Sequence, residues 1–285
     1  MARKDVWTLN DLADQSGKTF VITGANAGLG FESARALARK NARVIMACRN
    51  LEKAEAALNE ILQESPKAQV ELRRCDLSDF ASLRQFAEEL SKELPRLDVL
   101  MNNGAVGLMQ RRTNSNGYEL NLATNFLGHF ALTKHLFPLL KASAPSRVVT
   151  LSSSTHENAT INFDDLMAEK EFSGFPVYSQ SKLANLLFAR ELQKRIDATG
   201  LKAVSVAAHP GLINTGIFRE AASGSRLMSF MMGAFAPLVM DRPEVGARPQ
   251  VYAATEPDIS PGGYYGPNKR GRPSPGPALK RSSES

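Results

Sequence analysis

The sequence predicts an α/β fold, in which one doubly wound parallel sheet is covered by helices on both faces. Short apolar runs of strand length alternate with segments of helical periodicity through most of the 285 residues, and this alternation is typical of parallel strands joined by right-handed crossover helices. A glycine-rich stretch directly follows the first apolar run, where such sheets bind ligands. No repeat, charge run or Pro/Gly linker divides the chain before residue 266, so we expect one Rossmann-like domain of about seven strands over residues 18–266.

The first half of the chain contains four apolar runs separated by helical segments. Lys18–Thr23 (KTFVIT) ends at the glycines, as a buried parallel strand does. Leu51–Ser65 has helical spacing and stops at Pro66, because proline lacks the N–H that continues a helix. In chain order the expected elements are strand Lys18–Thr23, helix Leu29–Lys40, strand Arg43–Cys48, helix Leu51–Ser65, strand Gln69–Arg74, helix Ser82–Lys92 and strand Asp98–Asn102.

The second half begins with a long helical segment, Tyr118–Lys141, which we expect to bend before Pro138. Beyond Pro210 the pattern becomes irregular, and helical spacing resumes near residue 243. After the long helix the expected elements are strand Arg147–Ser152, helix Tyr178–Thr199, strand Ala203–Ala208, helix Pro243–Ala254 and a short strand Gly263–Tyr265.

Composition places the chain among soluble globular proteins. Its two cysteines, Cys48 and Cys75, argue against a disulfide scaffold and favour a reduced compartment, and no Cys/His cluster has the spacing of metal ligands. Residues 1–17 form a polar lead without the apolar core of a signal peptide, and no run of eighteen apolar residues occurs. We therefore expect no metal, no transmembrane segment and a cytoplasmic location.

The positive charge of the chain is concentrated at its C-terminal end. The formal net charge is +6, and residues 267–285 alone carry five basic residues and one acid, a net of +4, which leaves +2 for the rest. Because this segment is also rich in Pro, Gly and Ser, we expect a disordered basic tail over 267–285. A nucleic-acid partner is not expected, since the excess of positive charge lies outside the predicted domain.

The stretch TGANAGLG, Thr23–Gly30, carries glycines at the spacing G-x-x-x-G-x-G, which is two residues longer than the common dinucleotide fingerprint. Thr23 and Gly24 end the first strand, and Gly28 to Gly30 open the first helix. Free backbone N–H groups and the helix dipole are therefore available to a phosphate. An ordinary strand–helix turn is the alternative, and the position between the first strand and a helix favours a phosphate-binding loop.

The end of the second strand indicates which dinucleotide is bound. Proteins that prefer NAD usually place Asp or Glu about 20 residues beyond the glycines, on the ribose 2′-hydroxyl. Arg43–Asn50 contains no acid, and Arg49 stands at the strand end. A guanidinium pairs with a 2′-phosphate, which an acid would repel. A solvated surface arginine is the alternative; we expect NADP(H).

Tyr178 and Lys182, in YSQSK, are four residues apart and lie on one face of a helix. An ammonium beside a phenol favours the phenolate, so the pair can move a proton while a nicotinamide cofactor transfers hydride. Alone, Y-x-x-x-K is common on exposed helices. The run Ser152–Ser154 ends the fifth strand, at the sheet edge where a catalytic cleft is expected, and together with the glycine loop it favours an active site.

These motifs together resemble the short-chain dehydrogenase/reductase family over about Gly17 to Pro267. VIMACR, GHFALT and the long gap between serine and tyrosine are similar to the branch that holds retinol dehydrogenases, WW-domain oxidoreductases and protochlorophyllide reductases. The resemblance implies an enzyme that interconverts a carbonyl and an alcohol on a small molecule. The motifs that carry it are TGANAGLG, CDL at 75–77, NN at 102–103, TNFLGHF at 124–130, TLSSS at 150–154, YSQSK at 178–182 and HPG at 209–211.

The resemblance also implies a role for each matching residue. Tyr178 would be the general acid/base, and Lys182 would bind the nicotinamide ribose and lower the tyrosine pKa. Ser153 matches the catalytic serine, with Ser152 the alternative if the register differs by one, and Asn125 matches the residue whose backbone holds a water in the proton relay. The implied cofactor-binding residues are Thr23, Gly24, Asn26, Gly28, Leu29, Gly30, Arg49, Asp76, Leu77, Asn102, Tyr178, Lys182, Pro210, Gly211 and Thr215.

One motif departs from the family pattern, since N-N-A-G is replaced by NNGA with Gly104 and Ala105 exchanged. If the fourth place needs glycine for close cofactor approach or an unusual backbone angle, Ala105 carries a cost there. The departure bears on the geometry of the loop more than on the chemistry.

The segment after the sixth strand is expected to cover the substrate. Residues 212–242 lie where the resembling family has its substrate lid, and Arg226–Met240 within it is rich in Met and Phe, which pack adaptably on apolar ligands. A lipophilic substrate is one interpretation, packing on the protein itself or on a partner is another, and contact with a membrane surface is a third.

Two functions remain in competition: a carbonyl/alcohol oxidoreductase and a nucleotide-binding regulator with little turnover. The joint presence of Ser, Tyr, Lys and Asn favours the enzyme, because a sensor needs only the glycine loop. The histidines have no mutual spacing suited to a metal or a triad, and we expect structural roles for all four: His129, His135, His156 and His209.

Overall fold

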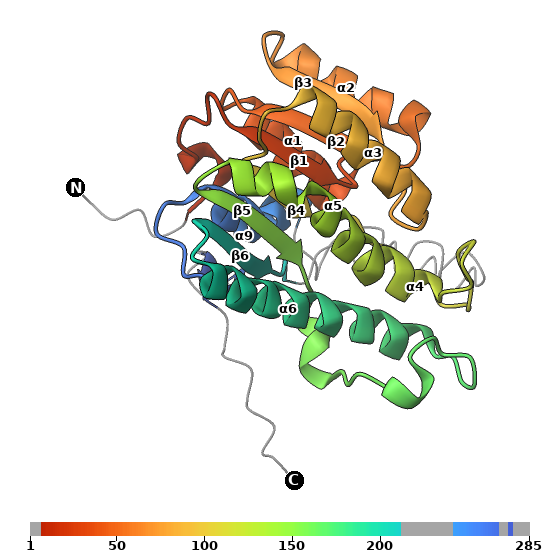
Figure 1. Ribbon diagram of the computed structural model, residues 1–285. Helices are drawn as coiled ribbons and strands as arrows, with labels where there is room; N and C mark the ends of the chain where they lie inside the picture. The colour runs from red at the N-terminus through yellow and green to blue at the C-terminus, as the bar shows by residue number, and fades with distance from the viewer. Residues whose placement is uncertain (1–6, 212–241, 268–272, 276–285) are drawn as a thin grey trace.

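The computed structural model describes residues 7–211, 242–267 and 273–275 (Figure 1). Its sheet has the strand order β3-β2-β1-β4-β5-β6-β7-β8. Strands β1 to β7 are parallel, as the sequence predicts, and β8 pairs antiparallel with β7. The strands are β1 (Thr19–Thr23), β2 (Arg43–Cys48), β3 (Gln69–Arg74), β4 (Val99–Asn102), β5 (Ser146–Leu151), β6 (Ala203–Ala208), β7 (Tyr264–Pro267) and β8 (Pro273–Pro275).

Helices cover both faces of the sheet, and each face has its own apolar core. Alternate residues of β1 point to opposite sides: Phe20 and Ile22 pack with α1 and α9, whereas Val21 packs with α3 and α5. This alternation is what buries a parallel sheet on both faces. The helices are α1 (Gly28–Ala38), α2 (Leu51–Glu64), α3 (Phe80–Glu93), α4 (Leu120–Leu122), α5 (Gly128–Ala142), α6 (Gly174–Thr199) and α9 (Pro243–Thr255).

The order of the strands determines where a ligand fits. β1 pairs with β2 on one side and with β4 on the other, so the chain connections leave β1 and β4 in opposite directions. In an open parallel sheet this reversal opens a crevice outside the carboxyl ends of the two strands. The glycine loop follows β1 and therefore borders that crevice.

The helix expected over Tyr118–Lys141 is interrupted by a π-helical turn. A short α4 is followed by a π-helical turn, Ala123–Leu127, before α5 begins at Gly128. α5 then continues through Pro138 to Ala142. The π turn was not foreseen because the hydrophobic periodicity is nearly continuous across it, and it contains Asn125, one of the predicted site residues.

Both ends of the predicted domain extend further than the sequence suggests. The lead contributes Leu9 and Leu12 to the core, so part of residues 1–17 packs on the domain. β8 lies inside the segment 267–285, and its backbone pairs with β7. The predicted lid at 212–242, apart from Arg242, lies outside the described residues.

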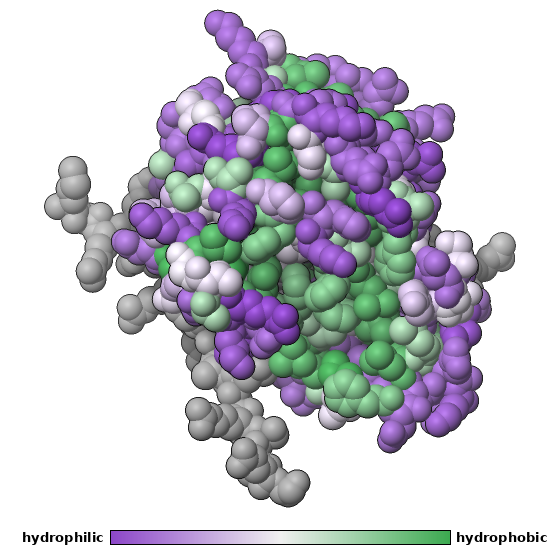
Figure 2. All heavy atoms as spheres, viewed as in Figure 1, coloured by the Kyte–Doolittle hydropathy of each residue, from purple (hydrophilic) through white to green (hydrophobic). Residues whose placement is uncertain are grey.

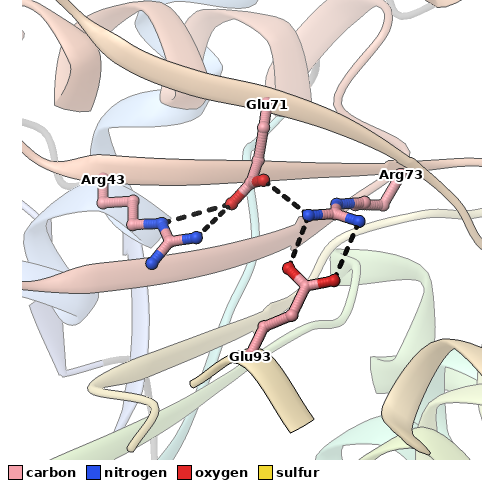
Figure 3. A network of polar contacts seen from close by, with 4 residues as sticks. All are labelled: Arg43, Glu71, Arg73 and Glu93. Atoms are coloured by element: carbon pink, nitrogen blue, oxygen red, sulfur yellow. Dashed lines mark hydrogen bonds and ion pairs between the residues drawn. The ribbon is translucent and has the colours of Figure 1, made fainter. Parts of the chain in front are cut away.

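The exposed edge of the sheet carries a chain of charged side chains (Figure 3). Glu71 on β3 accepts from Arg43 at 2.8 Å and from Arg73 at 2.9 Å, and Arg73 also reaches Glu93 at 2.6 Å. Partial burial alone would raise the pKa of Glu71, but hydrogen bonds and charge from the two arginines outweigh it and lower the pKa. Charged side chains on an edge strand discourage pairing with another sheet.

The outer face of α5 and α6 is apolar (Figure 2). Phe126, Phe130 and Phe188 form a ring cluster there, and Phe130 remains half exposed. A groove of about 440 Å³ runs between the two helices beside this cluster. Among the described helices, none is long and apolar enough to cross a membrane.

Candidate active site

A cavity of about 360 Å³ lies at the carboxyl ends of β1, β2 and β4, where the strand order reverses. One wall is the glycine loop and the start of α1, and the other is the loop that follows β4, residues 103–108. Its far end reaches Leu151, the last residue of β5. The predicted cofactor residues that line it are Gly24, Asn26, Gly28, Leu29, Gly30 and Arg49.

The glycines of the loop are required by space and by backbone angle. Gly24 and Gly28 have φ of 64° and 55°, which side chains disfavour. A Cβ on Gly30 would overlap the carbonyl of Gly24 and lie 2.5 Å from Nδ2 of Asn103. Ala27, the N-cap of α1, has no side-chain hydrogen bond to the first turn, whose N–H groups are left for an anion. The loop fits a dinucleotide pyrophosphate.

Two buried amide side chains, those of Asn103 and Gln250, support the glycine loop through hydrogen bonds. Nδ2 of Asn103 donates to the carbonyl of Thr23 at 2.8 Å, and Nε2 of Gln250 donates to Oδ1 of Asn103 at 3.1 Å and to Ser33 at 2.7 Å. Gln250 comes from α9, distant in the sequence, and no local motif signals its role. A buried and satisfied network of this kind keeps the loop in one conformation.

Two arginines lie at the cavity wall. Arg49 is exposed at the end of β2, as predicted, and Arg112 enters from the long loop after β4. Sequence analysis missed Arg112 because that loop has no periodicity that would place its side chains. Both guanidinium groups are available to a phosphorylated ligand.

Eight described residues that were predicted to bind the cofactor do not line the cavity: Thr23, Tyr178, Lys182, Pro210, Gly211 and three residues that follow or end β3 and β4, Asn102, Asp76 and Leu77. Asn102 is fully buried and donates to Thr133 at 3.0 Å, so its neighbour Asn103 takes the place at the wall. Asp76 accepts from the backbone and hydroxyl of Ser78, which orders the turn after β3. The third, Leu77, is buried against the loop after β4.

The exchanged pair Gly104–Ala105 is accommodated without strain. A Cβ on Gly24 would lie 2.8 Å from Cα of Gly104, and one on Gly104 would lie 2.7 Å from Leu77, so the two loops touch where this chain has glycine. The non-glycine residues with positive φ in the described structure are Asn41 and Ala168. Ala105 therefore has an ordinary backbone angle, and the part of the expected cost that would come from the backbone angle is absent.

The serine run resolves the choice between Ser152 and Ser153. Ser152 is buried, and its hydroxyl donates to the backbone carbonyl of Lys182 at 2.7 Å. Ser153 caps the short helix that follows, accepting from the backbone of Thr155, and its side chain lies beside Tyr178, whose pKa it lowers. Ser153 is therefore the serine that meets the tyrosine.

Tyr178 and Lys182 lie on the buried face of α6, which begins at Gly174 rather than at Tyr178. Nζ of Lys182 lies 5.7 Å from the centre of the Tyr178 ring and donates to the carbonyl of Leu151 at 3.2 Å. Burial raises the pKa of Tyr178 to about 12, although the Ser153 side chain lowers it, and burial lowers the pKa of Lys182 to about 7. The tyrosine pKa thus moves opposite to the expectation, because desolvation outweighs the effect of the Ser153 side chain.

Asn125 joins the loop after β4 to α6. Its side chain accepts from the backbone of Val106 at 2.8 Å, donates back to Val106 at 2.9 Å, and donates to Ser181 at 3.0 Å. All its side-chain bonding positions face the protein. The side chain of Asn125 therefore links the loop after β4 to α6.

Comparison with known proteins identifies the family. The short chain dehydrogenase profile matches residues 18–225. This chain belongs to the short-chain dehydrogenase family. Retinol dehydrogenase 12 of Mus musculus is 42% identical over 256 residues, which cover 89% of this chain and 79% of that protein. Retinol dehydrogenase 13 of the same species is 39% identical over 263 residues, which cover 91% of this chain and 78% of that protein.

The fold is shared with a solved structure. A crystal structure of an uncharacterized protein from Mycobacterium paratuberculosis is 38% identical, with a TM-score of 0.78 and coverage of 98% of this chain and 92% of that chain. As a short-chain dehydrogenase, the chain is an oxidoreductase that uses a nicotinamide dinucleotide and a small-molecule substrate. The predicted family and fold class are both confirmed.

The last predicted cofactor residues lie beyond β6. Pro210 and Gly211 follow β6 after one residue, His209, and Gly211 has φ of 81°, an angle that glycine adopts freely. They stand at the same edge of the sheet as Ser153. Thr215 lies outside the described residues.

Proposed function

We propose that this short-chain dehydrogenase is an NADP(H)-dependent enzyme that interconverts a carbonyl and an alcohol on a lipophilic substrate, with Tyr178 as general acid/base. The observation that carries the proposal is the buried pair of Tyr178 and Lys182 on one face of α6, with Ser153 beside the tyrosine, at the sheet edge that bears the dinucleotide cavity. A protein that only senses the nucleotide has no need of this buried constellation.

The proton chemistry follows from burial. With its pKa raised to about 12, Tyr178 holds its proton at neutral pH and is ready to donate it to the oxygen of a carbonyl being reduced. The hydroxyl of Ser153 lies beside the phenol and can hold the same substrate oxygen. The bound dinucleotide supplies the hydride. Lys182, whose pKa is lowered to about 7, can then return a proton to the Tyr178 phenolate.

The preference for the phosphorylated cofactor rests on the cavity wall. Arg49 lies at the end of β2 and lines the cavity, and none of the described residues that line it is acidic. A guanidinium favours a 2′-phosphate and leaves the unphosphorylated ribose without a carboxylate partner. Arg112 adds a second positive charge at the same cavity.

The lipophilic substrate is proposed from the relatives. Several are named retinol dehydrogenases, and retinol is a long apolar alcohol. The Met- and Phe-rich segment Arg226–Met240, outside the described residues, has the composition that would suit such a ligand.

The test combines turnover with cofactor binding. Purified protein should oxidise NADPH with a panel of lipophilic aldehydes that includes retinaldehyde, and Tyr178→Phe should lower kcat about 10²–10⁴-fold while NADPH fluorescence titration shows unchanged binding. Tyr118→Phe, on an exposed side chain outside the site, is the matched control. NADPH binding without turnover of any carbonyl would favour the nucleotide-binding regulator.

The same titration tests cofactor choice. The wild type should bind NADPH more tightly than NADH, and Arg49→Glu should reverse that order by placing a carboxylate at the ribose. Equal affinity for the two cofactors in the wild type would rule out the role given to Arg49.

A further inference from the structure

His129 lies between the cofactor loop and the proton-transfer site. It is the second residue of α5, and its side chain is 1% exposed. Nδ1 lies 2.9 Å from the backbone carbonyl oxygen of Asn125, and Nε2 lies 2.9 Å from the hydroxyl of Thr23. The ring therefore touches two residues that serve different halves of the site.

The partners determine where the ring proton is. The carbonyl of Asn125 can only accept, so Nδ1 carries the proton and donates. Burial lowers the pKa of His129 to about 3, so the ring is neutral and Nε2 is an acceptor. The hydroxyl of Thr23 must then donate to Nε2. Its other contact through that hydrogen, to the carbonyl of Met101, is longer at 3.3 Å.

The hydrogen bonds continue in both directions from the ring. On one side the hydroxyl oxygen of Thr23 accepts from the backbone N–H groups of Asn103 and Gly104, both at 2.9 Å, and these two residues line the cavity. On the other side the side chain of Asn125, whose backbone carbonyl contacts the ring, donates to the hydroxyl of Ser181. Ser181 lies between Tyr178 and Lys182 on α6. One oriented chain of bonds thus runs from the cofactor wall to the catalytic helix.

From this geometry we propose that His129 is a positioning residue that couples the cofactor loop to the π turn of Asn125. The proposal rests on the proposed function, since it concerns how the same site is aligned. A bound dinucleotide that fixes Thr23 and the loop after β4 fixes the ring, and the ring fixes the carbonyl of Asn125. Occupancy of the cavity is thereby transmitted to the turn that supports Ser181 and α6.

Two substitutions break the same bond from opposite ends. His129→Asn keeps a donor near the position of Nδ1 but cannot reach Thr23, and Thr23→Val removes the hydroxyl with a side chain of nearly equal size. His129→Asn should lower kcat about ten-fold, the value of one hydrogen bond. Thr23→Val also removes the acceptor of the Asn103 and Gly104 N–H groups, so its kcat should fall at least as far. Because the contact to His129 is already absent from Thr23→Val, the double variant should be no slower than Thr23→Val alone.

A packing role gives a different result, since two independent defects would multiply to about a hundred-fold loss. His129→Gln, whose longer amide can reach Thr23, should recover part of the lost rate over His129→Asn. His135→Asn, on the same helix but outside the chain of bonds, is the control and should leave kcat unchanged. Multiplicative effects or no recovery with Gln would overturn the proposal.

A second measurement does not depend on turnover. In the wild type, saturating NADPH should slow hydrogen exchange at the backbone amides of Ala123–Leu127, and in His129→Asn and Thr23→Val at saturating NADPH this protection should be lost. Equal protection in all three proteins would overturn the coupling. If the protection behaves as expected while no carbonyl is turned over, the coupling stands and the proposed reaction fails.

Discussion

The glycine loop and the catalytic face of α6 lie at the same edge of the sheet, but they present different groups to a ligand. The loop from Gly24 to Gly30 presents backbone N–H groups, and its residues are chosen by lack of space and by positive φ. The face of α6 presents Tyr178 and Lys182, two ionisable side chains removed from water. The first region depends on geometry alone, whereas the second depends on the cost of charge in an apolar surrounding.

This difference has a consequence for how each region fails. An added atom in the loop moves the backbone that meets the pyrophosphate, so binding is lost. A changed charge on α6 alters proton transfer and folding free energy but leaves the loop in place. Substitutions in the two regions should therefore affect different measurements.

Gly30→Ala should have the largest effect and should act on binding. The new Cβ overlaps the carbonyl of Gly24 and meets Asn103, so the loop must shift, at a cost of about 1–3 kcal/mol. NADPH affinity, measured by fluorescence titration, should fall about ten- to hundred-fold. Gly200→Ala is the matched control, because Gly200 has φ of 67° but no neighbour within 4 Å. Gly200→Ala should lower stability and leave NADPH binding unchanged. Unchanged NADPH affinity in Gly30→Ala would contradict the assignment of the glycine loop as the phosphate-binding loop.

Lys182→Met should have an intermediate effect and should act on stability with a dependence on pH. The pKa of Lys182 is lowered from 10.5 to about 7, so between these values the unfolded chain holds a proton that the folded protein releases. Wild-type stability therefore rises with pH across this window, and the penalty of the buried charge is complete below pH 7.

The measurement compares urea unfolding of both proteins at pH 6.5 and pH 9. Methionine carries no charge, so the advantage of Lys182→Met over the wild type should shrink by about 2 kcal/mol between the two values. Turnover should be lost at both. An advantage that does not change with pH would mean that Lys182 keeps its proton in the folded protein.

The sequence was informative where chemistry follows the strand order. Seven parallel strands, the glycine loop, Arg49 at the end of β2 and the Ser153–Tyr178 pair were all predictable, because each lies at a strand end or at helical spacing. Arg112, Asn103 and Gln250 were not, because their places depend on an irregular loop or on contacts between residues far apart in the chain.

The π turn and His129 show a further limit. A π turn adds one residue to a helical turn without breaking the apolar pattern, so periodicity cannot reveal it. His129 was assigned a structural role because it lacks a metal or triad partner in the sequence; its actual partners are a backbone carbonyl and a threonine 106 residues away. Burial likewise reversed the predicted direction of the Tyr178 pKa.

Glu71→Gln should have the smallest effect, and it shows what charge is worth outside the core. Arg43, Glu71, Arg73 and Glu93 form a network of charged side chains (Figure 3). Unlike Tyr178 and Lys182, these side chains remain partly exposed, from 28% to 40%. Solvent screens such pairs, so the loss of unfolding free energy should stay below about 1 kcal/mol and should decrease further in high salt. Calorimetry at low and high salt checks this, and NADPH affinity should be unchanged. A loss of unfolding free energy well above 1 kcal/mol that persists in high salt would show that solvent does not screen these ion pairs.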